Sequence, residues 1–182
     1  MPILPQEVDL WPENAFEHKS NTASRWSVLY SRSRSEKALA RHLRDLHVTY
    51  YLPVRRTVKR YQRRTVVSSV PLFPGYLFAR VTEEERAVCR RFRECAGELQ
   101  VADEDLLQKN LIDLRRILAS GLPVTREERL KPGMLVRITK GPLTDLCGRV
   151  LKNRRGIKFV LEVQFINQGI SIEIDGDSIE AV

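Results

Sequence analysis

The chain has 182 residues, of which 42 % are hydrophobic and 30 % are charged, so its composition is that of a folded globular protein. Its length fits one domain or two small ones. No apolar run reaches the roughly 18 residues that a membrane-spanning helix needs, and we expect no secretory signal. A disulfide framework and a zinc finger are not expected. The three cysteines are odd in number and far from any paired metal spacing, and the three histidines form no metal motif. We therefore expect a cytoplasmic protein that uses no metal and no cofactor.

The positive charge is concentrated in one part of the chain. The formal net charge is +8, and residues 25–64 hold 12 cations and 2 acids, a local net charge of +10. Such a concentration is typical of a nucleic-acid contact, because self-repulsion disfavours it unless a polyanion relieves it. The alternative is a solvated charged face that has no partner.

The first third of the chain carries one strand signal and one helix signal. Residues 1–24 hold three prolines and little periodicity, which predicts a flexible N-terminal extension. Residues 25–32 form a short apolar and aromatic run that predicts a strand. Apolar residues then recur at helical spacing, so a helix is predicted over 34–47. Its start carries Ser33 and Glu36 at the spacing of a capping box.

The middle of the chain alternates strand and helix signals. The helix predicted over 103–118 has an apolar stripe and begins at Asp103, which we expect to cap it. In chain order the predictions are an edge strand at 50–54, a hairpin at 55–70 with a charged tip at 59–64, a turn and buried strand at 72–81, a helix at 83–95, a short strand at 99–101 and a helix at 103–118.

The last third of the chain predicts a linker and then only strands. Residues 119–133 mix glycine, proline and charge without a period. Hydrophobic residues then alternate, above all from Ile157 to Phe165. Roughly fifty residues with several short strands favour a small closed barrel, because closure removes exposed sheet edges. The predicted fold class is therefore α+β, with an antiparallel sheet flanked by helices over 25–118 and an all-β barrel over 134–182.

Four stretches together resemble the NusG family of transcription elongation factors. They are the aromatic-led strand from Trp26 to Tyr30, the helix start EKALARHL, LFPGYLF at 72–78, and VRITKGPLTDLCGRV at 136–150, which resembles a KOW module. The resemblance implies an N-terminal polymerase-binding domain followed by an SH3-like KOW barrel. LFPGYLF and the arginine-rich hairpin are more similar to the specialised paralogues, such as RfaH and polysaccharide-operon antiterminators, than to general NusG.

The resemblance implies a polymerase contact made by aromatic residues. In an extended strand Tyr76 and Phe78 share one face, whereas Leu77 and Ala79 share the other, which we expect to pack against the helices. An uncovered aromatic face is typical of a protein-binding surface. The family's partner is the clamp helices of the largest catalytic subunit of RNA polymerase. The residues that would bind them are Trp26, Tyr30, Phe73, Tyr76 and Phe78. From the residues alone, the alternative is that these aromatics are core residues around a turn.

The resemblance also implies two nucleic-acid contacts at the upstream edge of the transcription bubble. The non-template DNA strand would be bound by Arg32, Arg34 and Lys37. The upstream duplex would be bound by Arg60, Arg63 and Arg64.

The expected function is binding rather than catalysis, because no catalytic motif is visible. We expect a monomeric elongation factor that suppresses pausing and termination and recruits Rho or a small-subunit ribosomal protein through its KOW module. Two alternatives stay open. One is a general NusG-type factor that promotes pausing or Rho-dependent termination, and the other is a ribosome-associated or RNA-binding KOW protein.

Overall fold

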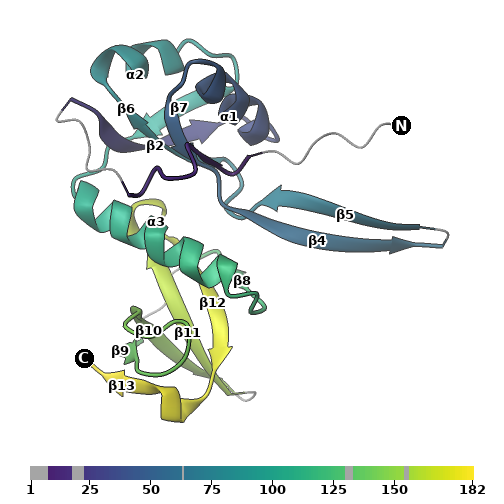
Figure 1. The fold of residues 1–182 in the computed structure, drawn as a ribbon, viewed down its shortest axis with the longest axis vertical. Coiled ribbons are helices and arrows are strands. Elements are labelled where there is room, and N and C mark those ends of the chain that lie inside the picture. Colours follow the sequence, from purple (N-terminus) through teal and green to yellow (C-terminus); the bar gives the residue numbers. More distant parts are fainter. Residues whose placement is uncertain (1–7, 18–22, 63, 130–132, 154–155) are drawn as a thin grey trace. The chain divides into compact units, whose positions relative to one another are not determined.

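The computed structural model shows two compact units, Met1–Glu104 and Asp105–Val182, which we describe separately. It describes residues 8–17, 23–62, 64–129, 133–153 and 156–182. Helices and an antiparallel sheet make up the first unit, whereas strands dominate the second, and this confirms the predicted α+β class (Figure 1). Within the described ranges, no helix has both the length and the apolar character needed to cross a membrane.

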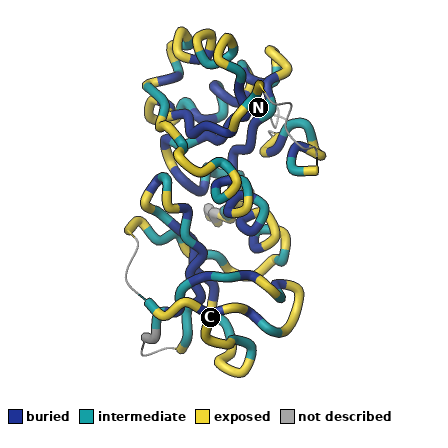
Figure 2. Tube along the Cα trace, turned by 90° about the vertical axis from the view of Figure 1, so that its left-hand side faces the viewer, coloured by how far each residue is buried: buried dark blue, intermediate teal, exposed yellow. Residues whose placement is uncertain are grey.

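The centre of the first unit is a five-stranded sheet in which all neighbouring strands run antiparallel. The order across the sheet is β1 (Leu10–Trp11), β3 (Thr49–Tyr51), β6 (Tyr76–Val81), β2 (Arg25–Ser31) and β7 (Cys95–Leu99). The central pair, β2 and β6, places Val28 opposite Phe78 and Tyr30 opposite Tyr76. Most of β2 and β6 is buried. Figure 2 colours the chain by burial, with the buried stretches in dark blue.

Two helices, α1 (Glu36–Asp45) and α2 (Glu83–Cys89), pack against one face of this sheet. Strand alternation turns Leu77 and Ala79 of β6 toward that face, as predicted, and they share a buried core with Leu39 and Leu43 of α1. Burial of one aliphatic side chain of this size contributes about 1.5–3 kcal/mol. This core therefore holds the helices on the sheet.

The start of α1 differs from the predicted one. The helix begins at Glu36, and its N-cap residue Ser35 makes no side-chain capping bond. The Glu36 carboxylate accepts a hydrogen bond from the backbone N–H of Gly75 at 2.8 Å. The predicted capping box of Ser33 and Glu36 is therefore absent, because the glutamate has a tertiary partner instead of a local one.

The helix α2 is capped at its start and is shorter than predicted. The Thr82 hydroxyl accepts a hydrogen bond from the N–H of Glu85, and the Glu85 carboxylate accepts one from the N–H of Thr82. This reciprocal pair forms a capping box. The helix ends at Cys89 rather than at residue 95, because Cys95 already begins the strand β7. That strand also lies earlier than the predicted one at 99–101.

Residues 8–17, which we call the N-terminal strap, are docked on the first unit, in contrast to the predicted flexible extension. The strand β1 pairs with β3, so that Leu10 lies opposite Tyr51. The Phe16 ring stacks on Trp26, with 5.6 Å between ring centroids and 24° between planes. It also meets Tyr51 edge-on at 5.5 Å. The strap therefore covers part of the aromatic face of the sheet.

The strands β4 (Val54–Tyr61) and β5 (Arg64–Pro71) form the predicted hairpin. They make a separate two-stranded sheet that projects away from the five-stranded sheet (Figure 1). At its base, the N–H of Leu72 donates to the carbonyl of Pro53 at 2.8 Å. The hairpin is thus anchored at one end and extends from the first unit at the other.

The second unit combines nearly all of α3 (Glu104–Ala119) with a six-stranded antiparallel sheet. The strand order is β13 (Ile179–Ala181), β9 (Met134–Ile138), β10 (Cys147–Asn153), β11 (Gly156–Val163), β12 (Gln168–Ile174) and β8 (Thr125–Glu127). Two 3-10 turns, η1 (Gln164–Ile166) and η2 (Gly176–Ser178), precede β12 and β13.

Two boundaries of the second unit differ from the predicted ones. The strand β8 lies inside 119–133, the predicted linker, and forms an edge of the sheet by pairing with β12. The helix α3, predicted as part of the domain over 25–118, belongs to the second unit, where Arg116 donates to the carbonyl of Thr144 at 3.0 Å. Neither assignment has a sequence signal, because β8 lacks an alternating pattern and an apolar stripe does not identify its partner.

Close packing explains one glycine of the second unit. A Cβ on Gly148 would lie 2.5 Å from the Cζ atom of Phe159, a ring that is fully buried. Only glycine allows this approach between β10 and β11.

Strand β11 ends at Val163 and Phe165 lies in η1, so the predicted alternation stops two residues early.

Replacing Phe16 with alanine is expected to lower the free energy of unfolding of the first unit by about 1–3 kcal/mol, because it removes the ring stacked on Trp26. Both tryptophans of the chain, Trp11 and Trp26, lie in this unit, so their fluorescence during urea unfolding reports on it. Glu13→Ala, an exposed change on the same strap, is the control and should leave the midpoint unchanged. Equal midpoints for the two variants would show that Phe16 does not hold the strap.

Candidate functional site

A hollow of about 790 Å³ lies at the base of the hairpin in the first unit. Its walls come from the end of β2, the start of α1, the base of β4 and β5, and the turn that precedes β6. Elements far apart in the sequence therefore meet around one concavity, which makes it a candidate site of this unit.

Backbone hydrogen bonds fix the segments around the hollow. Gly75 has a φ of +86°, a left-handed conformation that favours glycine. Its carbonyl accepts a bond from the N–H of Ser31 at 2.8 Å, and its N–H donates to the Glu36 carboxylate at the same distance. The N–H of Arg32 donates to the carbonyl of Glu94 at 2.8 Å. The backbone that carries the lining side chains is therefore held in place.

The hollow is strongly cationic. Four positively charged side chains line it, namely Arg32, Arg34, Lys37 and Arg55. The one acid in the lining, Glu36, is buried, and its carboxylate already accepts the N–H of Gly75. Within the described ranges, none of the four cations forms an ion pair. The site is thus suited to an anion, and arginine side chains favour phosphate and carboxylate groups.

An exposed aromatic ring forms part of the wall. Tyr30 is 45 % exposed, and its ring meets that of Tyr76 edge-on with 5.3 Å between centroids. A Cβ on Gly75 would lie 3.3 Å from the Tyr30 ring, so the absence of a side chain at Gly75 allows the ring to pack closely against the turn. The hollow therefore combines cations with an aromatic surface, as sites for single-stranded nucleic acid do.

The structure separates the predicted polymerase-binding residues into two groups. Tyr30 is exposed and Tyr76 is half-buried, so both are accessible. Trp26, Phe73 and Phe78 are at most 1 % exposed and offer no surface to a partner. The expectation that Trp26 and Phe78 lie on an uncovered face is therefore wrong, because alternation identifies the face but not what covers it.

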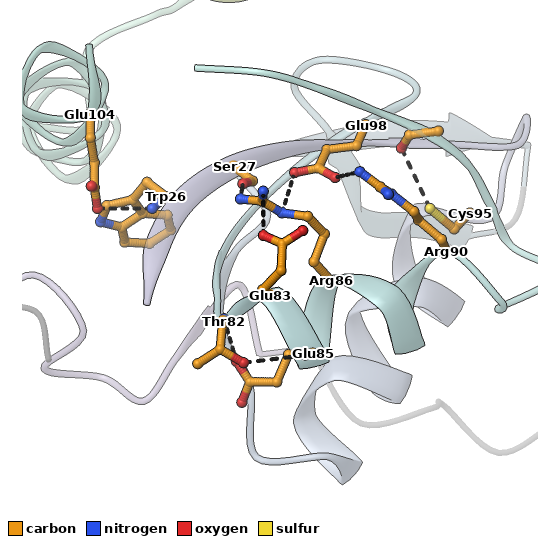
Figure 3. A network of polar contacts seen from close by, with 11 residues as sticks. Trp26, Ser27, Thr82, Glu83, Glu85, Arg86, Arg90, Cys95, Glu98 and Glu104 are labelled. Atoms are coloured by element: carbon orange, nitrogen blue, oxygen red, sulfur yellow. Dashed lines mark hydrogen bonds and ion pairs between the residues drawn. The ribbon is translucent and has the colours of Figure 1, made fainter. Parts of the chain in front are cut away.

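Trp26 is enclosed from two sides. Phe16 of the strap stacks on it, and the Arg80 guanidinium lies 5.0 Å from its ring centroid. Burial lowers the pKa of Arg80, and the Glu104 carboxylate opposes this effect. Glu104 also accepts a hydrogen bond from the backbone N–H of Trp26 at 2.9 Å (Figure 3). These contacts assign Trp26 to the core.

The predicted strand-binding residues, in contrast, come together. Arg32, Arg34 and Lys37 all line the hollow. Of the predicted duplex-binding residues, Arg60 is exposed on β4, and Arg64 begins β5. Arg63 lies outside the described residues. Sequence reasoning missed the role of Arg55, which belongs to the basic run but lies at the base of the hairpin, where only the folded chain brings it to α1.

A second cluster of charges, in Figure 3, is structural. The Glu98 side chain of β7 is 4 % exposed and forms ion pairs with Arg86 at 3.0 Å and Arg90 at 3.1 Å. Arg86 also pairs with Glu83 at 3.0 Å and donates to the Ser27 hydroxyl at 3.1 Å. These ion pairs and hydrogen bonds tie α2 to the sheet.

The cysteines of the first unit are suited to packing. Cys89 and Cys95 are free and buried. Burial, reinforced by the nearby Cys95 thiol, raises the pKa of Cys89 to about 11, and burial also raises that of Cys95. Both thiols are therefore neutral at physiological pH and poor nucleophiles. A search of the described residues finds no group of three or more side chains able to hold a metal ion.

Comparison with known proteins gives a match to one family model over part of the chain. Residues 24–105 match the family model described as "Transcription termination factor nusG". No curated protein sequence matches the chain. A solved structure of Thermotoga maritima NusG, described under domain interaction, is similar over 87 % of this chain and 97 % of that one, with 17 % identity and a TM-score of 0.48. A structure of the MjSpt4:Spt5 complex is similar over 86 % and 97 %, with 13 % identity and a TM-score of 0.28.

Gly75→Ala is expected to destabilise the first unit by about 1–2 kcal/mol, because the left-handed conformation is costly for alanine. The added methyl group also meets the Tyr30 ring, so the wall of the hollow must shift. Gly97→Ala is the matched control, since nothing lies within 4 Å of a Cβ at that position. Urea unfolding followed by tryptophan fluorescence measures both variants, and equal loss of stability in the two would contradict the role assigned to Gly75.

Proposed function

We propose that this chain is a transcription elongation factor of NusG type, which binds RNA polymerase and the upstream edge of the transcription bubble. One observation carries the proposal. Within the segment that matches the family model, the three cations predicted to bind the non-template strand line one hollow together with the exposed ring of Tyr30. The fold thus presents a cationic and an aromatic surface side by side.

The nucleic-acid contact is made in the hollow. Arg32, Arg34 and Lys37 bind phosphates of the non-template strand, and Arg55 extends this surface toward the hairpin. The absence of ion pairs to these cations within the described ranges supports this role, since no carboxylate competes with an incoming phosphate. The exposed Arg60 on the hairpin reaches the upstream duplex.

The polymerase contact is made by the accessible tyrosines. Tyr30 and Tyr76 form an edge-to-face pair on the central strands, and aromatic residues of this kind dominate binding energy at interfaces. Their partner is the clamp helices of the largest catalytic subunit. The contact is smaller than the sequence predicts, because Trp26, Phe73 and Phe78 belong to the core.

The mechanism is binding energy applied to one conformation of the elongation complex. A factor that binds both the clamp and the bubble edge favours the state in which the two are correctly placed, and so suppresses pausing and termination. The description of the matching family as a termination factor favours a second candidate, a general NusG-type protein that promotes pausing or Rho-dependent termination.

The second unit supplies a recruiting surface. Met134, Leu135 and Val182 are exposed by 64 %, 44 % and 60 %, and the N–H of Val182 donates to the carbonyl of Leu135 at 3.2 Å. Exposed apolar side chains of this kind are available to a protein partner. Rho or a small-subunit ribosomal protein is the proposed partner.

The double variant Tyr30→Ala and Tyr76→Ala is expected to abolish the effect of the protein on single-round transcription through a pause site and a Rho-dependent terminator, because it removes the exposed aromatic pair. Read-through that rises with the native chain and is lost in the variant supports antitermination. Termination that rises and is lost in the variant supports the second candidate. Leu122→Thr, an exposed change in the second unit, is the control, and no effect of the native chain would overturn both.

The triple variant Arg32→Ala, Arg34→Ala and Lys37→Ala is expected to lower the magnitude of the salt slope for single-stranded DNA by about 2, since each phosphate contact contributes about 0.7. A titration with fluorescently labelled DNA at several salt concentrations measures it. The matched control removes three exposed cations of the second unit, in Arg115→Ala, Arg129→Ala and Lys140→Ala. The same slope change in both variants would show that DNA binding depends only on the net charge of the chain. That result would contradict a site in the hollow.

A further inference from the structure

An exposed apolar pair lies in the middle of the hairpin. Val58 of β4 and Val67 of β5 are directly opposite each other, and they are 60 % and 51 % exposed. Cross-strand partners share a face of the ribbon, so the two side chains form one apolar spot in contact with water. Two branched aliphatic side chains in this position bury little apolar surface within the chain. A partner surface would bury more of it.

Cations flank this spot along the same strand. Arg56 and Arg60 are two residues before and after Val58, so alternation places them on the same face, and both are exposed. Opposite them on β5 lie Ser69 and Thr65, whose hydroxyl groups both donate and accept hydrogen bonds. The face therefore presents an apolar centre between two guanidinium groups.

The other face of the ribbon is also basic. Arg55 lies on it and is exposed. Residues 54–71 hold six cations and no acid. An acid-free ribbon with cations on both faces complements a partner whose negative charge lies on two sides, as the two phosphate walls of a DNA groove do.

The dimensions of the ribbon agree with this partner. The hairpin forms a sheet of its own, and its eight-residue strands span about 26 Å at 3.3 Å per residue. Its strands lie about 4.8 Å apart. The major groove of B-form DNA is about 12 Å wide and admits a two-stranded β-ribbon, whereas that of A-form RNA is too deep and narrow.

We propose that the β4–β5 hairpin lies in the major groove of duplex DNA, with the pair of Val58 and Val67 against the base edges and Arg56 and Arg60 on phosphates or guanine edges. This inference rests on the proposed function and deepens it, since it assigns the groove and the residues of the upstream duplex contact. Thymine presents a methyl group in this groove, which is the apolar surface that the valine pair fits.

The test uses the full chain and a labelled A·T-rich duplex of about 20 base pairs, two helical turns. Replacing thymine by uracil removes only the major-groove methyl groups. This change is expected to weaken binding of the native chain about threefold to fourfold for each methyl group buried. The variant Val58→Ser and Val67→Ser should bind both duplexes equally, because serine carries no methyl group and the apolar spot is lost. Leu122→Thr in the second unit is the control and should behave as the native chain.

A second measurement identifies the groove. Methylation of guanine N7, which lies in the major groove, should weaken binding, whereas the minor-groove ligand netropsin should not compete. Competition by netropsin, or equal affinity of the native chain for thymine and uracil duplexes, would overturn the groove assignment and leave the duplex contact standing. No binding to either duplex at about 50 mM salt would overturn the duplex contact too, while the polymerase contact is judged separately by the tyrosine variant. Urea unfolding of each variant verifies its fold.

Discussion

One buried carboxylate connects the segments on which the hollow depends. Glu36 begins α1, is 6 % exposed and accepts the N–H of Gly75, whose carbonyl in turn accepts the N–H of Ser31. The start of the helix, the turn before β6 and the end of β2 are thereby joined through three residues. A charge-assisted hydrogen bond of this kind is stronger than a neutral one, and its buried position limits exchange with water. It also places one negative charge beneath four cations that would otherwise repel one another.

In the proposed function, the hollow and the hairpin divide the basic charge between two tasks. Arg55 stands at the junction, since it lines the hollow and also belongs to the first pairs of the ribbon. Cations near α1 surround a concavity with an aromatic wall, which suits an unpaired strand. Cations farther along the ribbon lie on a narrow, protruding element, which suits a groove. A bubble edge offers both forms of nucleic acid, so one continuous surface is matched to the point at which duplex and single strand meet.

The sequence predicts strongly periodic parts of the fold and fails where burial depends on distant segments. Alternation identifies β6 and places Leu77 and Ala79 against the helices, because side-chain direction in a strand is a local property. The same rule puts Phe78 on the opposite face but does not show that this face is covered. The strap that encloses Trp26 has no period, so its docking has no signal. In the site, the family resemblance implies Arg32, Arg34 and Lys37, whereas Arg55 requires the tertiary structure.

The position of the hairpin also has a consequence for how the first unit folds. The strands β3 and β6 are antiparallel neighbours in the sheet, and the hairpin is the connection between them. Pairing that starts at its tip brings successive residues together over short loops, so the entropy of closing the connection is lost in small steps. When Val54 reaches Pro71, Tyr51 is already close to Phe78. Pairing of β4 with β5 thus brings β3 and β6 together. The sequence of the hairpin must therefore favour strand pairing and also provide a basic surface.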